Sequence, residues 1–351
     1  NFNHKLTKFN YEKKLILIFI SLFVVIAIIE IFLRIFIPQE LTSPFRVNGK
    51  DGSFLNMKNA SAVHFFNERK ITYKFGPFHN RAYDFEAKEN KILVLGDSFT
   101  FGWLLNDKDT FIYKLNKKFS DYYFINAAAG GWGTSDQLKY LIEFCSSIKP
   151  KYTFLFINTD DLVRSNLSNL FYLNDDYKLV SGENKIYAID KLTENFFYKI
   201  MVENLHLVNF LRYKISKIIY YKKFKDKILI TKKKERDSKK DKDLIFMQKL
   251  FLEIKKEIKK CNTQVVFINL GWKSYDDYNL DDKGYININF LNEAKSFFKK
   301  NSFNFIDLNS DMKIIQSNKS KYIIKTDGHP NELTNQIIYD FLSKKIEKLI
   351  Y

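Results

Sequence analysis

An uninterrupted apolar run that ends in Gly-Asp-Ser is the feature that most constrains the fold of this chain. Residues 92–95 are four apolar residues with no polar alternation, a pattern typical of a strand buried on both faces of a parallel sheet. Gly96 lets the backbone turn sharply, and Asp97 and Ser98 follow just beyond the strand. Open α/β sheets place their chemistry at that edge. Ser98 is therefore a candidate nucleophile, and ordinary turn formation is the alternative role of the tripeptide.

The same arrangement recurs along the chain and predicts an alternating α/β fold. Four further apolar runs have the length of strands, and small, polar or acidic clusters follow the first two of them. These runs are residues 122–125, 153–157, 264–270 and 303–308. Helical patterns lie between the runs, so we expect a doubly wound, flavodoxin-like parallel sheet of about five strands with helices on both faces. The functional site should lie along the carboxyl edge of this sheet.

Several residues have the chemistry and spacing of helix boundaries. Asp109 is placed to cap the helix that follows the first strand. Thr134 and Gln137 have the spacing of a capping box for the next helix. Pro330 suits the first position of a terminal helix, which puts His329 at the N-cap, in a loop beyond the last strand.

The N-terminal region contains an apolar segment that is long enough to cross a bilayer. Residues 15–37 include few polar side chains, and Glu30 and Arg34 are i,i+4 partners near the outer end of the segment. Four lysines precede it, so the positive-inside rule places the N-terminus in the cytoplasm and the rest of the chain outside, in the periplasm. No small-residue cleavage site follows, and we interpret the segment as a single-pass signal anchor. A buried core helix is the alternative.

These features divide the chain into four parts. They are a cytoplasmic tail (1–14), the anchor (15–37), a juxtamembrane stalk that merges into the folded domain (38–88), and the α/β domain (89–351). Within the last part, residues 162–260 depart from the strand–helix rhythm. We expect a loop-like stretch over 162–195 with a hairpin near residues 181–184, then Lys-rich helices over 196–260 with a polar break at 232–242. We interpret this region as an insertion that covers the site and contributes to substrate selection.

The chain is strongly basic, with a formal net charge of +17. Lysine-rich runs over 222–227 and 232–242 have the charge to follow phosphates or anionic lipid. No nucleic-acid-binding motif or stacking pattern of aromatic residues accompanies them. We therefore favour a solvated lysine-rich surface and expect no nucleic-acid partner.

The two cysteines, Cys145 and Cys261, have neither metal-ligand spacing nor the pattern of a disulfide framework. We interpret both as small buried hydrophobic residues, with a single bridge as the alternative for an exported chain. We expect neither a metal nor a cofactor.

Three residues have the chemistry of a serine-hydrolase triad, which needs a serine, an imidazole that takes its proton, and a carboxylate that orients the imidazole. Ser98, His329 and Asp327 supply these groups at the same predicted sheet edge. A purely structural His-Pro pair at a helix start is the alternative for His329. The other histidines lack a neighbouring carboxylate at a strand end: His4, His64, His79 and His206.

Three blocks of this chain resemble the SGNH/GDSL hydrolase family, in order and each at a strand end. The blocks are residues 96–100 (Gly-Asp-Ser-Phe-Thr), 126–134 and 327–331 (Asp-Gly-His-Pro-Asn). The correspondence covers most of 70–160 and 264–351. The last block has the Asp-x-His spacing of some members rather than the commoner Asp-x-x-His.

The resemblance implies a role for each matched residue. Ser98 takes the position of the nucleophile, and Asp327 and His329 take those of the acid and the base. Gly131 falls on the glycine whose backbone N–H serves the oxyanion hole, together with the N–H of Ser98. The implied activity is that of a serine esterase.

One further block departs from the family pattern. The family usually places Asn-Asp after the third strand, and the position of that Asn, an oxyanion donor, holds Asp160 in this chain. An ionised carboxylate does not donate a hydrogen bond and repels a developing oxyanion. Asn158, two residues earlier, is an alternative donor if the register shifts. Loss of one such donor typically costs about 10²–10³ in turnover.

Three functions fit these blocks. The first is a membrane-anchored esterase or deacylase that removes O-acyl (acetyl) groups from an envelope carbohydrate or a small molecule through an acyl-Ser98 intermediate. The second is an O-acyltransferase in which a sugar hydroxyl replaces water as the acceptor. The third is a non-catalytic carbohydrate-binding relative. The complete triad favours the first two, and Asp160 keeps the third open.

Overall fold

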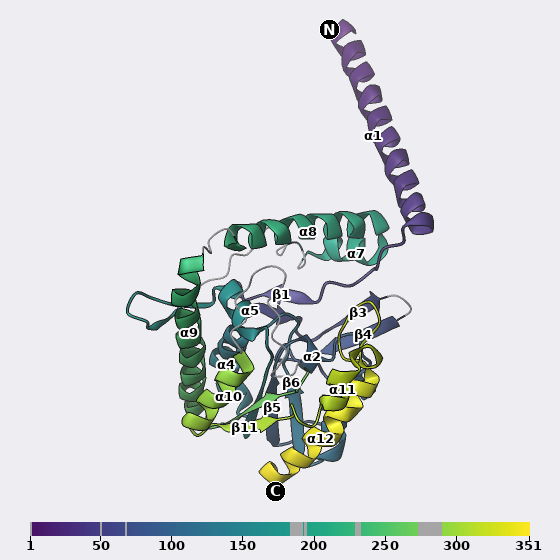
Figure 1. The fold of residues 1–351 in the computed structure, drawn as a ribbon. Coiled ribbons are helices and arrows are strands. Elements are labelled where there is room, and N and C mark those ends of the chain that lie inside the picture. The colour runs from purple at the N-terminus through teal and green to yellow at the C-terminus, as the bar shows by residue number, and fades with distance from the viewer. Residues whose placement is uncertain are drawn as a thin grey trace.

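The computed structural model describes residues 2–49, 51–66, 69–182, 192, 195–228, 233–272 and 290–351. Its centre is a sheet of five parallel strands in the order β11-β10-β7-β5-β6 (Figure 1). The strands are β5 (Asn90–Leu95), β6 (Tyr122–Asn126), β7 (Tyr152–Ile157), β10 (Gln264–Asn269) and β11 (Asn304–Asp307). In chain order this is the 2-1-3-4-5 arrangement of flavodoxin-like folds. The predicted fold class is confirmed.

Helices cover both faces of this sheet. On one face lie α4 (Thr134–Ile148), α9 (Lys233–Lys260) and α10 (Phe290–Lys300). On the other lie α3 (Phe111–Lys118), α11 (Lys313–Ser317), the 3₁₀ turn η2 (Lys319–Tyr322) and α12 (Glu332–Ile350). Successive strand residues point to opposite faces of the sheet. Leu93 therefore packs against the face covered by α4, α9 and α10, and Ile92 and Val94 pack against the face covered by α3 and α12. Because both faces are buried, the strands are the apolar runs seen in the sequence.

The residue that caps α3 is Thr110, and the prediction of Asp109 is wrong. The Thr110 hydroxyl accepts a hydrogen bond from the backbone N–H of Tyr113 over 3.3 Å. Asp109 instead ends η1 (Asp107–Asp109), a 3₁₀ turn that precedes the helix. The carboxylate is therefore one residue too early to reach the free N–H groups of α3.

The start of α4 also differs from the predicted capping box. Thr134 is the first helical residue, and the N-cap is Gly133, whose N–H donates to the buried carboxylate of Asp136 over 3.0 Å. Gln137 is not part of a box, because its side-chain amide donates to the carbonyl of Phe156 in β7 over 2.9 Å. Gln137 thus ties α4 to the sheet.

The N-terminal helix α1 (Phe2–Phe36) extends away from the α/β domain (Figure 1). Its stretch Lys13–Phe36 is long and apolar enough to cross a membrane, by length and composition. Near its end, Glu30 accepts hydrogen bonds from the backbone N–H groups of His206 and Leu207, over 2.9 and 2.8 Å. The base of α1 is therefore attached to a helical segment far along the chain.

Residues 38–88, predicted as a stalk, are packed on the domain. They form two antiparallel pairs, β1 (Arg46–Asn48) with β2 (Phe54–Asn56) and β3 (Ala60–Phe66) with β4 (Arg69–Phe75). Phe45 and Tyr73 pack with Phe101 in a separate aromatic cluster. The sequence analysis did not predict these strands, although β4 alternates between buried and exposed residues.

The region over 162–260 contains more regular structure than predicted. It begins within α5 (Asp161–Ser168), where a loop was predicted. A hairpin of β8 (Phe171–Leu173) and β9 (Leu179–Ser181) then comes earlier than expected, and residues 183–184 lie outside the described chain. Two helices, α7 (Phe196–Asn204) and α8 (His206–Ile228), lie across the domain beside the base of α1 (Figure 1). The polar break predicted over 232–242 is wrong for residues 233–242, because they belong to the helix α9 (Lys233–Lys260). Lys232 lies outside the described residues.

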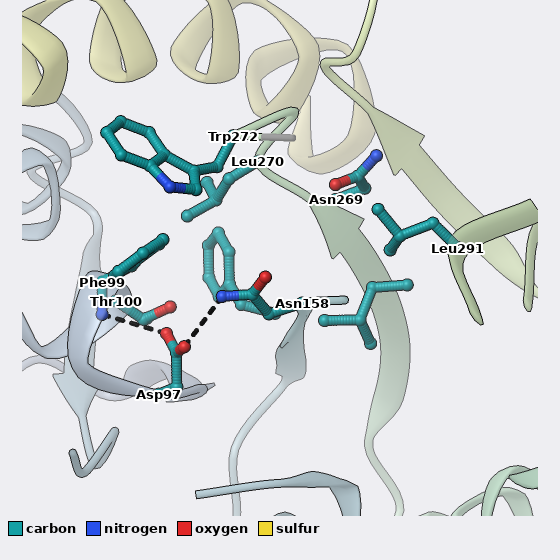
Figure 2. Close-up of a pocket in the computed structure, with 10 residues that line it drawn as sticks. Asp97, Phe99, Thr100, Asn158, Asn269, Leu270, Trp272 and Leu291 are labelled. Carbon is teal, nitrogen blue, oxygen red and sulfur yellow. Dashed lines mark hydrogen bonds between the residues drawn. The ribbon is translucent and has the colours of Figure 1, made fainter. Parts of the chain in front are cut away.

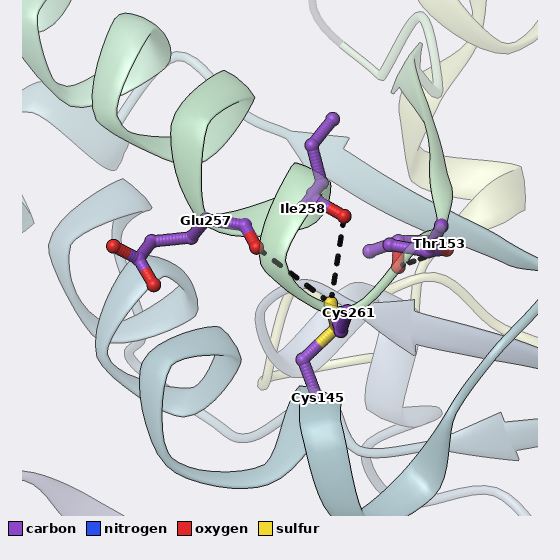
Figure 3. Close-up of a disulfide and its surroundings, with 6 residues drawn as sticks. Cys145, Thr153, Glu257, Ile258 and Cys261 are labelled. Atoms are coloured by element: carbon purple, nitrogen blue, oxygen red, sulfur yellow. Dashed lines mark hydrogen bonds between the residues drawn. A yellow bond between two sulfur atoms is a disulfide. The ribbon is translucent and has the colours of Figure 1, made fainter.

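The cysteines form a disulfide, so their interpretation as unpaired hydrophobic residues is wrong. Cys145 in α4 and Cys261, just after α9, are 116 residues apart in sequence, with their Cα atoms 5.9 Å apart (Figure 3). The bond joins two neighbouring helices on one face of the sheet. Disulfides persist mainly in oxidising compartments.

Candidate active site

Ser98 lies three residues after the end of β5, at the first position of the short helix α2 (Ser98–Phe101). Asp97 is the N-cap, and its carboxylate accepts a hydrogen bond from the N–H of Phe99 over 2.9 Å. Gly96 is required by space, because a Cβ there would lie 2.3 Å from Thr100 Oγ1. The turn therefore holds Ser98 at the carboxyl edge of the sheet, as the sequence predicted.

The structure brings Ser98, His329 and Asp327 together in one hydrogen-bonded chain. His329 Nε2 is 2.8 Å from Ser98 Oγ, and His329 Nδ1 is 2.5 Å from Asp327 Oδ1. In the neutral imidazole that carries its proton on Nδ1, Ser98 donates to Nε2, and Nδ1–H donates to the carboxylate. Burial acts to raise the pKa of Asp327, but hydrogen bonds and charge from His329 hold it below its usual value.

The loop that carries His329 differs in detail from the prediction. The cap of α12 is Asn331, whose Oδ1 accepts from the N–H of Thr334 over 3.1 Å, so Pro330 and His329 lie before the helix. The N–H of Ile324 donates to the carbonyl of His329 over 2.8 Å. This bond and the bridge between Ile323 and Pro330 fix the loop from the other side.

Aromatic rings surround the His329 imidazole. The Phe99 ring lies 5.3 Å from it, edge to face, and the Trp103 ring lies 5.9 Å away. The Trp103 side chain also acts to lower the pKa of Asp327. These contacts hold the imidazole in the orientation that Ser98 requires.

The loop after β6 approaches Ser98 from the other side. A Cβ on Gly130 would lie 3.8 Å from Ser98 Cβ and 2.7 Å from Arg46 Nη2. Gly131 has a φ of +83°, in the left-handed region, and no atom lies within 4 Å of the position of a Cβ there. Gly131 therefore borders open space and is adjacent to Gly130, the residue of this loop that faces Ser98.

Asn158 and Asp160 lie in the turn between β7 and α5. Asn158 Nδ2 donates to Asp97 Oδ2 over 2.9 Å, so its amide contacts the carboxylate beside the serine (Figure 2). Asp160 is the N-cap residue of α5, and its side chain is half exposed. The small pocket in Figure 2 has a volume of only about 10 Å³ and lies between Asn158 and Trp272.

Arg164 is part of this site, although the sequence did not single it out. Its Nη1 donates to Asp97 Oδ2 over 2.8 Å and to the carbonyl of Trp132 over 3.2 Å, and its Nη2 lies 3.5 Å from Asp160 Oδ2. Burial acts to lower its pKa, but the neighbouring carboxylates of Asp97 and Asp161 raise it above the usual value. The i,i+4 spacing from Asp160 was the available signal.

A much larger cavity, of about 870 Å³, lies between residues 38–48 and the helices α7 and α8. Trp103, which contacts His329, also lines this cavity. Its volume falls in the usual range of ligand sites, roughly 300–1,000 Å³.

The sheet order and the hydrogen-bonded Ser-His-Asp chain define an α/β protein with a hydrolase-type site at its carboxyl edge. No protein-family model and no curated protein matches the sequence. Solved structures that are similar include esterases and members of the lipolytic G-D-S-L family.

Three of these structures illustrate the extent of the likeness. The psychrotrophic esterase EstA from Pseudoalteromonas sp. has 14% identity and a TM-score of 0.43, over 75% of this chain and 99% of EstA. The acetyl xylan esterase AlAXEase has 15% identity and a TM-score of 0.42, over 73% and 99%. A G-D-S-L family protein from Veillonella parvula has 11% identity and a TM-score of 0.39, over 72% and 96%. At these values, the activity has to be argued from the residues of the site.

Proposed function

We propose that this protein is a serine esterase of the SGNH/GDSL type that removes O-acyl groups, such as acetyl, from an envelope carbohydrate. The observation that carries the proposal is the continuous chain of hydrogen bonds from Ser98 through His329 to Asp327. A serine hydroxyl is a weak nucleophile at its ordinary pKa and needs such a base. The supporting resemblance lies in the three sequence blocks that carry these residues.

The proposed reaction has two steps. His329 Nε2 takes the proton of Ser98 as Oγ attacks the ester carbonyl, and the tetrahedral intermediate collapses to acyl-Ser98 as His329 protonates the leaving alcohol. Water then attacks the acyl group by the reverse sequence of proton transfers and releases the carboxylic acid. Asp327 stabilises the imidazolium that forms in each step.

The proposed oxyanion donors are the backbone N–H groups of Ser98 and Gly131. The N–H of Ser98, in the first turn of α2, has no partner within that helix. Asp160 supplies no donor when ionised. We assign Arg164 to the compensation of this charge, because its guanidinium lies 3.5 Å from the Asp160 carboxylate.

A second candidate function is O-acyl transfer to a sugar hydroxyl by the same triad. The large cavity supports it, because Trp103 both lines the cavity and contacts His329, and an acceptor needs room near acyl-Ser98. A non-catalytic carbohydrate-binding protein is the third reading.

Labelling by a fluorophosphonate probe tests the nucleophile. The full chain in detergent should be labelled, Ser98→Ala should not be, and Ser317→Ala, an exposed serine in α11, should match the parent. Labelling that persists in Ser98→Ala would reject the assignment. A folded parent chain that is never labelled would favour the binding protein. Acetyl transfer to added glycan, faster than release of acetate, would favour the transferase.

We also propose that α1 anchors the domain outside the cytoplasm, with its lysine-rich N-terminus inside. The apolar stretch of α1 and the disulfide both support this location. A reporter active only outside the cytoplasm, fused after Tyr351, should give a signal. A signal from a cytoplasm-specific reporter alone would contradict both the location and the envelope substrate.

A further inference from the structure

The large cavity carries charges that the proposed ester chemistry does not use. Two arginines line it from different elements: Arg46 from β1, and Arg212 from α8. Arg46 is also the residue whose guanidinium lies beside Gly130, next to Ser98. Arg46 therefore lies both at this cavity and beside the loop that faces Ser98.

The electrostatic environment of this cavity is positive. Arg46 is exposed in β1, and the charges of Arg212 and Arg164 act to lower its pKa while that of Asp136 acts to raise it. His64, which also lines the cavity, has its pKa lowered to about 4 by burial, against the opposing charge of Asp327, so it is neutral near neutral pH. Glu40 is the acidic side chain among the described lining residues, and it is exposed.

The position of Arg212 follows from how α8 is held. Four residues of α8 that line the cavity recur at i, i+3, i+4 and i+7, which places them on one face: Asn209, Arg212, Tyr213 and Ser216. The start of α8 is bound to Glu30 of α1 and to Gln39, just after α1, whose N–H donates to His206 Nδ1 over 2.8 Å. The helix is therefore fixed over the cavity.

We propose that this cavity binds an anionic group of the substrate, a carboxylate or a phosphate, between Arg46 and Arg212 while the ester group faces Ser98. Guanidinium groups bind such oxyanions through paired N–H donors. An anion between the two arginines also relieves their mutual repulsion. The inference rests on the proposed function in one respect, that the bound molecule is the ester substrate. The favoured substrate class is thus an O-acylated acidic glycan, such as one that contains a uronic acid.

The first test compares two acetylated disaccharides that differ only in a carboxylate, one containing glucuronate and one containing glucose. The measured quantity is the ratio of their kcat/KM values with the full chain in detergent. Arg212→Gln and Arg46→Gln should each lower this ratio about tenfold, through KM, because a charge-assisted hydrogen-bond pair is lost. The kcat/KM ratio of Arg212→Lys should lie between the ratios of these two variants and that of the parent. Lys214→Gln removes the same charge from the opposite face of α8 and should leave the ratio unchanged.

The second test measures binding without turnover. Ser98→Ala should bind the acetylated glucuronate disaccharide in calorimetry, and Arg212→Gln in that background should weaken the binding about tenfold. Inorganic phosphate and glycerol phosphate serve as probes for a phosphate-bearing substrate, and tighter binding of these than of glucuronate would assign the group to phosphate.

The outcomes separate the two proposals. Arginine-dependent binding without any ester hydrolysis by the parent chain would leave the anion site standing and overturn the esterase. Hydrolysis that does not discriminate between the two disaccharides, with no effect of either arginine variant, would overturn the anion site and leave the esterase standing.

Discussion

Asn158 donates its side-chain amide to the carboxylate of Asp97, the residue that immediately precedes the candidate nucleophile. The same carboxylate oxygen accepts from Arg164 over 2.8 Å. Asp97 therefore joins the end of β5 to the turn after β7, and Asn158 contributes to that connection. Because the Asn158 amide already binds Asp97, the oxyanion chemistry is best tested at Asp160, the position of the usual donor.

Asp160→Asn should raise the rate of ester hydrolysis about tenfold or more, because it supplies an amide donor and removes a repelling charge. The measurement is kcat for a simple acetyl ester with the full chain. Asp176→Asn, an exposed carboxylate in the β8–β9 turn, is the matched control and should not alter the rate.

Asn158→Ala discriminates between the two candidate donors. An unchanged rate in Asp160→Asn together with a sharp loss in Asn158→Ala would assign the donor to Asn158. If neither variant alters any activity, the turn after β7 is not part of the site. Faster ester hydrolysis with slower transfer to glycan in Asp160→Asn would support the transferase.

Arg164 should matter more when Asp160 is charged. Arg164→Gln leaves the Asp160 carboxylate without its neighbouring guanidinium, so we expect a loss of about tenfold or more in kcat. In the Asp160→Asn background the same substitution should cost less, and the double-mutant cycle measures this difference as a coupling. Equal losses in both backgrounds would show that Arg164 acts through Asp97 alone.

The strands and the triad were predictable because their signals are local. Buried parallel strands are apolar runs, and a serine after Gly-Asp or a histidine after Asp-Gly is visible at once in the sequence. Arg46 has no such signal, since an isolated arginine looks the same on a surface and in a cavity, and Arg164 has only its i,i+4 spacing from Asp160. Only the packing of β1 and α5 near Ser98 gives them a role.

Caps and cross-links were predicted less well, for a different physical reason. Asp109 and Thr110 are both good capping residues, and the choice depends on where the preceding 3₁₀ turn ends. The pairing of Cys145 with Cys261 depends on the packing of α4 beside α9, which no spacing in sequence encodes.

Removal of the disulfide should destabilise the chain markedly. The bond closes a loop across a sequence separation of 116 residues, and replacing both Cys145 and Cys261 by Ala should cost about 3–5 kcal/mol in the free energy of unfolding. Chemical denaturation with and without reductant is the measurement, and the double variant should not respond to the reductant. Two free thiols in the unreduced native chain would contradict the pairing.

Asp136 should make the stability of the fold depend on pH. Burial raises the pKa of its carboxyl to about 7 from an ordinary value of 3.8, although the hydrogen bond from Gly133 and the charge of Arg164 oppose the change. The folded chain therefore holds a proton that the unfolded chain loses, so this contribution to stability is full below about pH 4 and is lost as the pH rises towards 7. The upper limit of this contribution to the free energy of unfolding is about 4 kcal/mol.

Asp136→Asn keeps an acceptor for Gly133 and never ionises, so its Tm should exceed that of the parent by several degrees near pH 8 and by much less near pH 5. Asp176→Asn should show no such difference, and a gap in Tm that is the same at both pH values would contradict a raised pKa at Asp136.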